Sequence, residues 1–312
     1  MKILVGYTGF VGSNLYSAGQ FDAVYHSKNI EEAYGTEPDL LIYAGLRAEK
    51  YLANNAPEKD MELILQAEKN IAEIHPKKLV LISTIDVLKR PCGADETTKI
   101  DTEGLHPYGY NRHRLEVWVR EKYPDALIIR LPALFGKNIK KNFIYDYMNI
   151  IPFMLTESKM EELSGADNSL KAYYIRLENG FYKLKEITGR DREDLKRKFK
   201  QLGFSALSFT DSRSRYQFYN LGRLWNDIRT ALEEGILLWH PATEPISAGE
   251  LYFFLTGETF VNELKGAPVD YDYRTIHADV FGGENGYICD KIVVLKEIKE
   301  FVNDYVGKEE QE

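Results

Sequence analysis

Cysteine, surplus positive charge and long apolar runs are all scarce in this chain of 312 residues. Its two cysteines, Cys92 and Cys289, provide neither a disulfide framework nor a metal cluster, which suits a reducing compartment. The net charge of -8 argues against a basic surface for nucleic acid. No apolar run is long enough to span a membrane, and the chain begins as a strand, not as a signal peptide. We therefore expect a cytoplasmic protein without nucleic-acid or membrane partners.

The first pattern that is present is a series of glycines after a short apolar run. Residues 3–5 predict a buried strand, and Gly6, Gly9 and Gly12 follow at three-residue spacing before a helix expected at 12–19. A strand, a glycine turn and a helix N-terminus form a site for a diphosphate, because glycine lets the backbone approach closely and the helix offers unpaired N–H groups. A glycine-rich turn without a ligand is the alternative.

Apolar strands and helical segments alternate through the first part of the chain. Strands are expected at 22–26, 39–45, 78–84 and 126–136, and helices at 56–74 and 108–122. Such alternation is typical of a parallel sheet covered on both faces. The sequence thus predicts an α/β fold, with a Rossmann-like doubly wound parallel sheet, over residues 1–136.

The alternation ends after Gly136. Further helices are expected at 191–202, 222–234 and 290–305, the first of them with a charged, solvated face. The segment ILLWH predicts a returning strand. We expect residues 222–250 to rejoin the sheet, and residues 137–312 to form mainly a smaller C-terminal α+β substrate domain.

The end of the second strand bears on which dinucleotide would bind. An acidic residue there would pair with the adenosine ribose and reject a 2′-phosphate. The sequence instead has Ser27 and Lys28, which could hold a 2′-phosphate. We therefore expect NADP(H) in preference to NAD(H). A lysine that is merely solvated is the alternative interpretation of Lys28.

Two polar motifs follow later strands. STIDV (83–87) ends the fourth strand, and PYGYNR (107–112) begins the next helix. Because open parallel sheets bind ligands beyond the carboxyl ends of their strands, both motifs and the glycine turn are expected at one crevice. Tyr108 and Arg112 share a helix face, and the positive charge would lower the pKa of the phenol for proton transfer. Thr84 would hydrogen-bond a substrate carbonyl or alcohol.

In these motifs the sequence resembles the extended short-chain dehydrogenase/reductases, specifically the NAD-dependent epimerase/dehydratase family that acts on nucleotide sugars. The resemblance rests on GYTGFVG, STIDV, PYGYNR and RLPALFG in order within residues 1–136, and on ATEPISAGEL at 242–251. It implies a catalytic triad formed by Thr84, Tyr108 and Arg112. The family has lysine where this chain has Arg112; that lysine holds the nicotinamide ribose and keeps the tyrosine acidic, and arginine is not interchangeable with it.

The motifs and the resemblance together define the expected binding residues. The cofactor-binding set of the NAD(P)-binding domain is Gly6, Gly9, Phe10, Val11, Gly12, Ser27, Lys28, Ala44, Gly45, Tyr108, Arg112 and Pro132. The substrate-binding set is Asp86, Asn142, Arg213 and Arg215. Capping of the following loop is the alternative role of Asp86, and simple surface exposure is that of the two arginines. No pair among the six histidines has metal-ligand spacing, so no metal site is expected.

The expected function is that of an NAD(P)-dependent oxidoreductase-type enzyme for a nucleotide sugar: an epimerase, a dehydratase or a reductase. The resemblance also implies a homodimer. The alternative hypothesis is a non-catalytic NAD(P)-binding sensor of the same fold, which the replacement of lysine by Arg112 motivates. The presence of both Thr84 and Tyr108 favours the enzyme.

Overall fold

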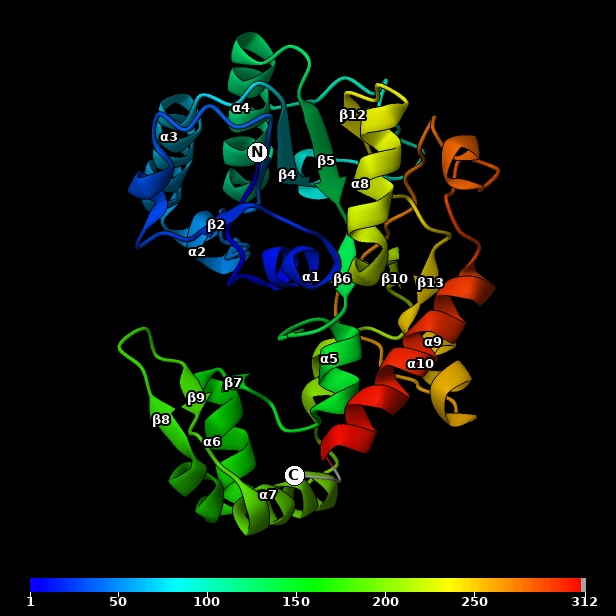
Figure 1. Ribbon diagram of the computed structural model, residues 1–312. Helices are drawn as coiled ribbons and strands as arrows, with labels where there is room; N and C mark the ends of the chain where they lie inside the picture. Colours follow the sequence, from blue (N-terminus) through cyan, green and yellow to red (C-terminus); the bar gives the residue numbers. More distant parts are fainter. Residues whose placement is uncertain (310–312) are drawn as a thin grey trace. The chain divides into compact units, whose positions relative to one another are not determined.

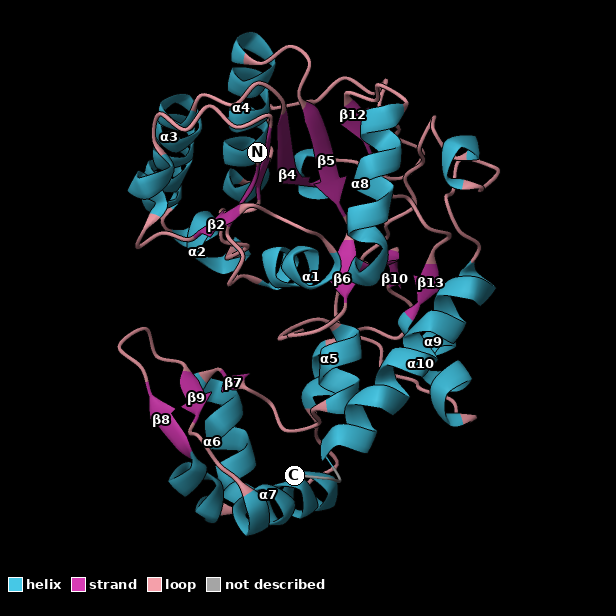
Figure 2. Cartoon of the chain, viewed as in Figure 1, coloured by secondary structure: helices cyan, strands magenta, loops and turns pink. Residues whose placement is uncertain are grey.

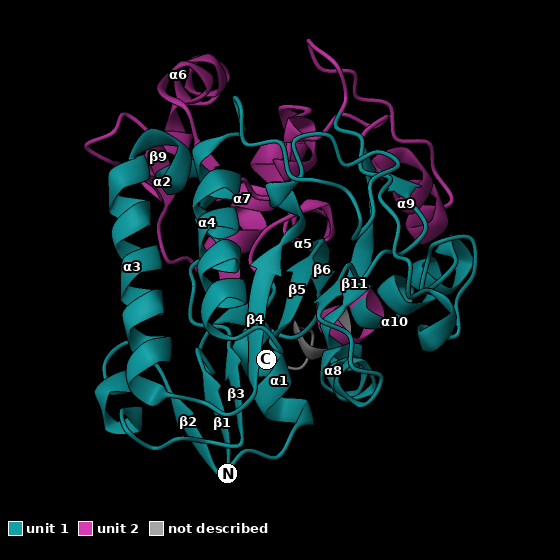
Figure 3. Cartoon of the chain, turned by 90° about the horizontal axis from the view of Figure 1, so that it is seen from above, with its two compact units in different colours: residues 1–139, 215–247, 269–301 teal, residues 140–214, 248–268, 302–312 magenta. Residues whose placement is uncertain are grey.

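The computed structural model describes residues 1–309 (Figure 1). The chain divides into two compact units (Figure 3). Unit 1 contains residues 1–139, 215–247 and 269–301, and unit 2 contains residues 140–214, 248–268 and 302–312. Unit 1 thus takes two later segments of the chain besides its first 139 residues.

A six-stranded sheet forms the centre of unit 1 (Figure 1). Its strand order is β12-β5-β4-β3-β1-β2, and all the pairings are parallel. The strands are β1 (Lys2–Val5), β2 (Ala23–Tyr25), β3 (Leu40–Tyr43), β4 (Leu79–Thr84), β5 (Leu127–Leu131) and β12 (Leu238–Trp239). The winding direction reverses at β1, because β2 lies on one side of it and β3 on the other. Open sheets of this kind bind ligands at the reversal point, beyond the carboxyl ends of the strands.

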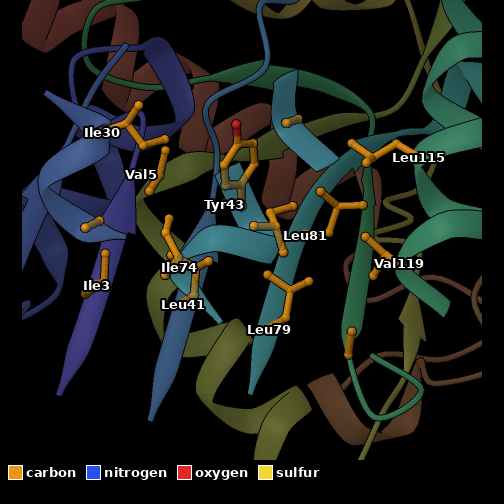
Figure 4. Close-up of a cluster of buried hydrophobic side chains, with 14 of the residues drawn as sticks. Ile3, Val5, Ile30, Leu41, Tyr43, Ile74, Leu79, Leu81, Leu115 and Val119 are labelled. Atoms are coloured by element: carbon orange, nitrogen blue, oxygen red, sulfur yellow. The ribbon is translucent and has the colours of Figure 1, made fainter. Parts of the chain in front are cut away.

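Helices α3 (Pro57–Ile74) and α4 (Pro107–Lys122) cover one face of the sheet. The core of this face joins the helices to alternate strand positions, and includes Leu41, Leu81, Ile74, Leu115 and Val119 (Figure 4). Pro57 occupies the first turn of α3, where a missing N–H costs nothing. Burial of this apolar stripe contributes more to the stability of the two helices than helix propensity does.

The other face of the sheet is buried as well. The strand positions between those of the first face are fully buried, among them Leu4, Ile42 and Val80. Helices α1 (Phe10–Ala18) and α8 (Leu224–Glu233) contact each other on this side (Figure 3). Burial on both faces confirms the predicted doubly wound α/β fold.

The sequence predicts one strand over 126–136, whereas the structure has two. β5 ends at Leu131, and β6 (Ala133–Phe135) pairs in parallel with β11 (Phe218–Asn220) in a separate two-stranded sheet. Pro132 stands between β5 and β6, and proline has no N–H to donate to a ladder. The prediction of one continuous strand is therefore wrong. The returning strand predicted from ILLWH is confirmed as β12, which pairs with β5.

The remaining elements of unit 1 are short, apart from the last helix. They are α2 (Lys50–Asn55), β10 (Arg215–Tyr216), β13 (Ile246–Ser247) and the first part of α10 (Lys291–Glu309). β10 and β13 form an antiparallel pair.

Unit 2 has a small core of its own. Its elements are α5 (Phe143–Met148), β7 (Met154–Leu155), α6 (Glu157–Ala166), β8 (Tyr174–Arg176), β9 (Tyr182–Leu184), α7 (Gly189–Gln201) and α9 (Ala248–Thr256) (Figure 2). The three strands form an antiparallel sheet in the order β7-β9-β8. Leu195 and Phe199 of α7 are fully buried, while its charged side chains form exposed pairs such as Lys196 with Glu193. This confirms the predicted helix with a solvated face.

A buried ion pair ties α4 to β5 in unit 1. Arg130 Nη2 donates to Glu116 Oε2 at 2.7 Å, and Ser83 Oγ donates to Glu116 Oε1 at 2.6 Å. The side chains of Glu116 and Arg130 are only 1% and 2% exposed. Burial acts to raise the pKa of Glu116, but the charge of Arg130 and the hydrogen bonds to the carboxylate outweigh it and lower the pKa to about 2.

This pair makes a pH-dependent contribution to stability. Because the folded-state pKa of Glu116 lies below the unfolded value, its stabilisation is full at neutral pH and is lost as the pH falls from about 4.5 towards 2. We expect Glu116→Gln to lower the free energy of unfolding at pH 7 by about 3 kcal/mol, since it leaves Arg130 buried without its carboxylate. Urea unfolding of both proteins across this range should show the difference shrinking in acid. A difference that stays constant would contradict this assignment.

Candidate active site

Close backbone contacts explain the glycines of the first turn. Gly6 has a φ of +89°, and a Cβ on it would lie 2.4 Å from the carbonyl oxygen of Ala44. A Cβ on Gly12 would lie 2.0 Å from the carbonyl oxygen of Gly6. The Gly9 N–H donates to that same oxygen at 2.9 Å. The turn over residues 6–12, called the glycine cradle below, is therefore folded on itself and against the end of β3, with no room for a side chain at Gly6 or Gly12. This close backbone packing is what the glycine motif predicts for a diphosphate site.

The N-terminus of α1 opens from this cradle. Gly9 is the N-cap, and the first turn, with Phe10, Val11 and Gly12, carries no acidic residue. The first N–H groups of a helix have no partner within it, and the helix dipole makes this end attractive to anions. Asn14, in the same helix, bonds to both the N–H and the carbonyl of Lys137 at 3.1 and 2.8 Å, which secures the loop after β6. These residues fit a dinucleotide diphosphate.

The end of β2 lies directly beside the turn. The Gly6 N–H donates to the carbonyl of Tyr25, the last residue of β2, at 2.7 Å. Ser27 and Lys28 follow with exposed side chains. The backbone of Ala44 and Gly45, after β3, closes the other side of Gly6. Gly6, Ser27, Lys28, Ala44 and Gly45 therefore lie at the carboxyl edge of the sheet.

Thr84 and Tyr108 are brought together at the same edge. Thr84 ends β4, and its hydroxyl accepts the Asp86 N–H at 3.2 Å. Tyr108, in the first turn of α4, has the Thr84 hydroxyl close enough to lower the pKa of its phenol. Leu131 pairs in register with Thr84, so Pro132 leaves the sheet at this same level. The predicted juxtaposition of STIDV and PYGYNR is thus present.

Gly109 allows this approach. A Cβ on Gly109 would lie 2.2 Å from the backbone carbonyl oxygen of Asp86, so α4 can rest on the turn after β4 only with glycine there. The ring of His106 caps the helix, with Nδ1 accepting the Gly109 N–H at 3.1 Å. Both contacts hold Tyr108 beside Thr84.

Asp86 is the centre of a cluster that the sequence did not predict. Its Oδ1 accepts from Lys50 Nζ at 2.9 Å and from the Tyr271 hydroxyl at 2.9 Å. Lys50 belongs to α2 and Tyr271 to the segment after residue 269, respectively 36 and 185 positions away in the sequence. No local motif marks either residue, so only the fold reveals them. Asp86 therefore has charged and phenolic neighbours in addition to its backbone contact with Thr84.

Arg112 is not a free cation. Its guanidinium makes two hydrogen bonds to the Asp60 carboxylate, at 2.7 and 3.1 Å, and one to the carbonyl of Arg47 at 2.8 Å. The Arg112 and Asp60 side chains are 3% and 2% exposed. Arg112 also lies over the ring of Tyr108, with its Cζ 4.5 Å from the ring centroid. Its charge is therefore balanced by a carboxylate on α3.

The pKa of Tyr108 moves in the opposite direction from the one predicted. Burial raises it, and Arg112 lowers it by a smaller amount. The negative charge of Asp86 adds to the rise, and the net pKa lies above the ordinary value. The expectation that Arg112 would bring this pKa towards neutrality is therefore wrong, because desolvation of the phenolate exceeds the attraction of a cation that Asp60 already neutralises.

The other expected substrate residues have partners within their own units. In unit 2, Asn142 caps α5 by accepting the N–H groups of Ile144 and Tyr145, and Arg213 makes two bonds to Asp211. In unit 1, Arg215 makes two bonds to Asp270, at 2.7 and 2.9 Å. A substrate phosphate would have to compete with these carboxylates for the arginines.

Within residues 1–309, no group of three or more His, Cys, Asp or Glu side chains is placed to hold a metal ion. In the same part of the chain, no helix combines the length and the apolar character needed to cross a membrane.

No protein-family model and no curated protein matches this sequence. Solved structures do match the fold. The chain aligns with a dTDP-4-dehydrorhamnose reductase from Yersinia enterocolitica at 14% identity and a TM-score of 0.62, covering 97% of this chain and 98% of that one. A UDP-glucose 4-epimerase from Thermotoga maritima, solved with UDP-glucose, matches at 14% identity and a TM-score of 0.62, over 99% of each chain. A dTDP-4-dehydrorhamnose reductase from Bacillus anthracis, in complex with NADP, matches at 16% identity and a TM-score of 0.61, covering 97% of this chain and 98% of that one.

The matched structures cover both units and share one fold with this chain. They are reductases and epimerases of nucleotide sugars, the kind of protein to which the sequence motifs already pointed. At these identities the likeness concerns the fold.

The contact at Gly12 yields a prediction with a matched control. Gly12→Ala should lower the free energy of unfolding by about 1–3 kcal/mol, because the new methyl group meets the Gly6 carbonyl. Gly165→Ala, in helix α6 with open space around it, should raise it by up to about 1 kcal/mol. Chemical denaturation of the three proteins measures both values. Equal effects of the two substitutions would refute the close contact.

The Asp60–Arg112 pair yields a second prediction. Asp60→Asn should lower the free energy of unfolding by about 3–5 kcal/mol, because it leaves the Arg112 charge buried and unpaired. The control is Glu68→Gln. Glu68 on α3 pairs with Arg114 on α4, whose side chain is 43% exposed, so this substitution should lower the free energy of unfolding by less than about 1 kcal/mol. Denaturation midpoints and slopes provide the measurement. A loss for Asp60→Asn no larger than the control would show that the pair does not hold α3 to α4.

Proposed function

We propose that this chain is an NAD(P)-dependent enzyme that acts on a nucleotide sugar as a reductase, an epimerase or a dehydratase. The observation that carries the proposal is the placement of the Tyr108 phenol beside the Thr84 hydroxyl, at the sheet edge that also holds the glycine cradle. A phenol paired with a hydroxyl, beside a diphosphate site, is an arrangement suited to proton transfer at a carbinol or carbonyl. The folds of nucleotide-sugar reductases and epimerases support the same class.

The roles of the residues follow from their positions. Gly6, Gly9 and Gly12 would let the cofactor diphosphate approach the backbone closely, and the N–H groups in the first turn of α1 would hold it. Tyr108 would transfer a proton to or from the substrate oxygen, and Thr84 would orient that oxygen. The nicotinamide, when bound, supplies or accepts the hydride.

Arg112 would act mainly by positioning Tyr108. It packs against the ring of Tyr108 and is fixed by Asp60 and by the Arg47 carbonyl. Because Asp60 holds the guanidinium in place, Arg112 is suited to fixing the orientation of the Tyr108 ring. Direct contact with the nicotinamide ribose, which the family's lysine makes, remains our sequence-based prediction for Arg112.

The state of Tyr108 favours reduction among the three reactions. A raised pKa keeps the phenol protonated at neutral pH. Such a phenol is ready to give its proton to a carbonyl oxygen, so that the carbonyl becomes an alcohol once hydride has reached its carbon. Asp86, held by Lys50 and Tyr271, would accept a hydrogen bond from a sugar hydroxyl nearby.

Tyr108→Phe tests this proposal. Oxidation of NAD(P)H should be measured with a panel of nucleotide sugars and their keto derivatives, for the wild type and the variant. Loss of the proton donor should lower kcat by roughly a hundredfold to ten-thousandfold. Tyr110→Phe is the matched control, since Tyr110 is an exposed tyrosine two residues further along α4, and it should keep the wild-type rate. Equal activity of Tyr108→Phe and the wild type would remove Tyr108 from the mechanism.

A non-catalytic NAD(P) sensor is the second candidate. The neutralisation of Arg112 by Asp60 favours it, because no free cation then stabilises the Tyr108 phenolate from that side. Such a protein would bind the dinucleotide and show no turnover with any member of the panel. Turnover that depends on Tyr108 would exclude it.

A further inference from the structure

The first residue after strand β2 is not an acid but a histidine, His26, whose ring and backbone are both held in place. The ring of His26 stacks on that of Tyr7, with centroids 5.7 Å apart and planes at 20°. Tyr7 is the residue after Gly6 in the glycine turn, and Tyr16 of α1 packs edge-on against it at 5.6 Å. The backbone of His26 is held too, because its N–H donates to Asn29 Oδ1 at 2.9 Å. His26 is thus attached to the diphosphate cradle through Tyr7.

One hydrogen bond determines which ring nitrogen of His26 carries the proton. The backbone N–H of Lys28 donates to His26 Nδ1 at 3.1 Å. A backbone amide can only donate, so Nδ1 must be the acceptor nitrogen with a free lone pair. In the neutral ring the proton then resides on Nε2. His26 is therefore a hydrogen-bond donor at Nε2 without needing a positive charge.

A hydrogen-bond donor at this position suits a ribose that carries a 2′-phosphate, whereas an acid suits a ribose with a free 2′-hydroxyl. A carboxylate at the end of the second strand accepts hydrogen bonds from the ribose hydroxyl and repels a phosphate. A phosphate offers only acceptor oxygens at neutral pH and favours N–H donors and positive charge. The Nε2–H of His26, the exposed Ser27 hydroxyl and the exposed Lys28 ammonium are donors of this kind within three consecutive residues.

We propose that His26 is a specificity-determining residue that selects a 2′-phosphorylated dinucleotide, through an Nε2–H donor set by the Lys28 amide and a ring oriented by Tyr7. The inference rests on the proposed function only in that a dinucleotide binds at the glycine cradle. Lys28 adds charge to the site, while His26 adds the directed hydrogen bond.

The test is the binding of NADP⁺ and NAD⁺ without substrate, by isothermal titration calorimetry. The wild type should bind NADP⁺ more tightly than NAD⁺. His26→Phe keeps a ring to stack on Tyr7 but removes both nitrogens, and it should reduce this preference by roughly tenfold to a hundredfold, the range expected for one hydrogen bond to a charged group. His26→Asp should reverse the preference, because it puts an acceptor and a negative charge at the same position.

Two controls separate the donor from other effects. Lys28→Met removes the charged side chain but keeps the backbone amide that orients His26. This variant should therefore still prefer NADP⁺ to NAD⁺, and the double variant with Lys28→Met and His26→Phe should have lost the preference. Thermal unfolding of each variant reports whether the loop still folds. Equal binding of the two dinucleotides by the wild type, or a full preference in a folded His26→Phe variant, would overturn the role of His26. Failure of the wild type to bind either dinucleotide would overturn the proposed function as well.

Discussion

The buried pair of Asp60 and Arg112 is the interaction on which the arrangement of the site depends. It joins α3 to the first turns of α4, which carry Tyr108. Arg112 also reaches the loop after β3 by donating to the Arg47 carbonyl. Asn111 adds a third bond to Asp60, at 2.8 Å. Because neither charge is exposed to water, each depends on the other, and removal of one would leave a buried unpaired ion. The Arg112 guanidinium therefore couples α4 to the loop after β3, and the Asp60 carboxylate on α3 holds this guanidinium in place.

This pairing changes the electrostatics of the proposed proton donor. A lone cation four residues after Tyr108 would favour phenolate, and that was the expectation from the spacing alone. With Asp60 in contact, Arg112 lowers the Tyr108 pKa less than burial raises it, and Asp86 acts in the same direction as burial. The result is a phenol that keeps its proton, which is the form needed to protonate a carbonyl oxygen.

Backbone contact sets the geometry at three glycines in unit 1. Gly6 and Gly12 allow the first turn to fold against β3 and on itself, and Gly109 allows α4 to rest on the turn after β4. The first two were predicted, because a glycine series between a strand and a helix has a known physical purpose. Gly109 stands within the PYGYNR motif, but its contact with residue 86 cannot be inferred from the residues around position 109.

The sequence by itself determined the α/β class, the strand positions and the convergence of its three motifs, because buried parallel strands and glycine turns leave local patterns of apolar and small residues. It predicted α3 to within one residue and missed the break at Pro132. Only the tertiary structure decided that Asp60 neutralises Arg112, that Lys50 and Tyr271 meet at Asp86, and that His26 stacks on Tyr7. The physical reason is that charge pairing and ring stacking depend on partners brought together by folding, whereas the apolar pattern that determines burial can be recognised in the sequence itself.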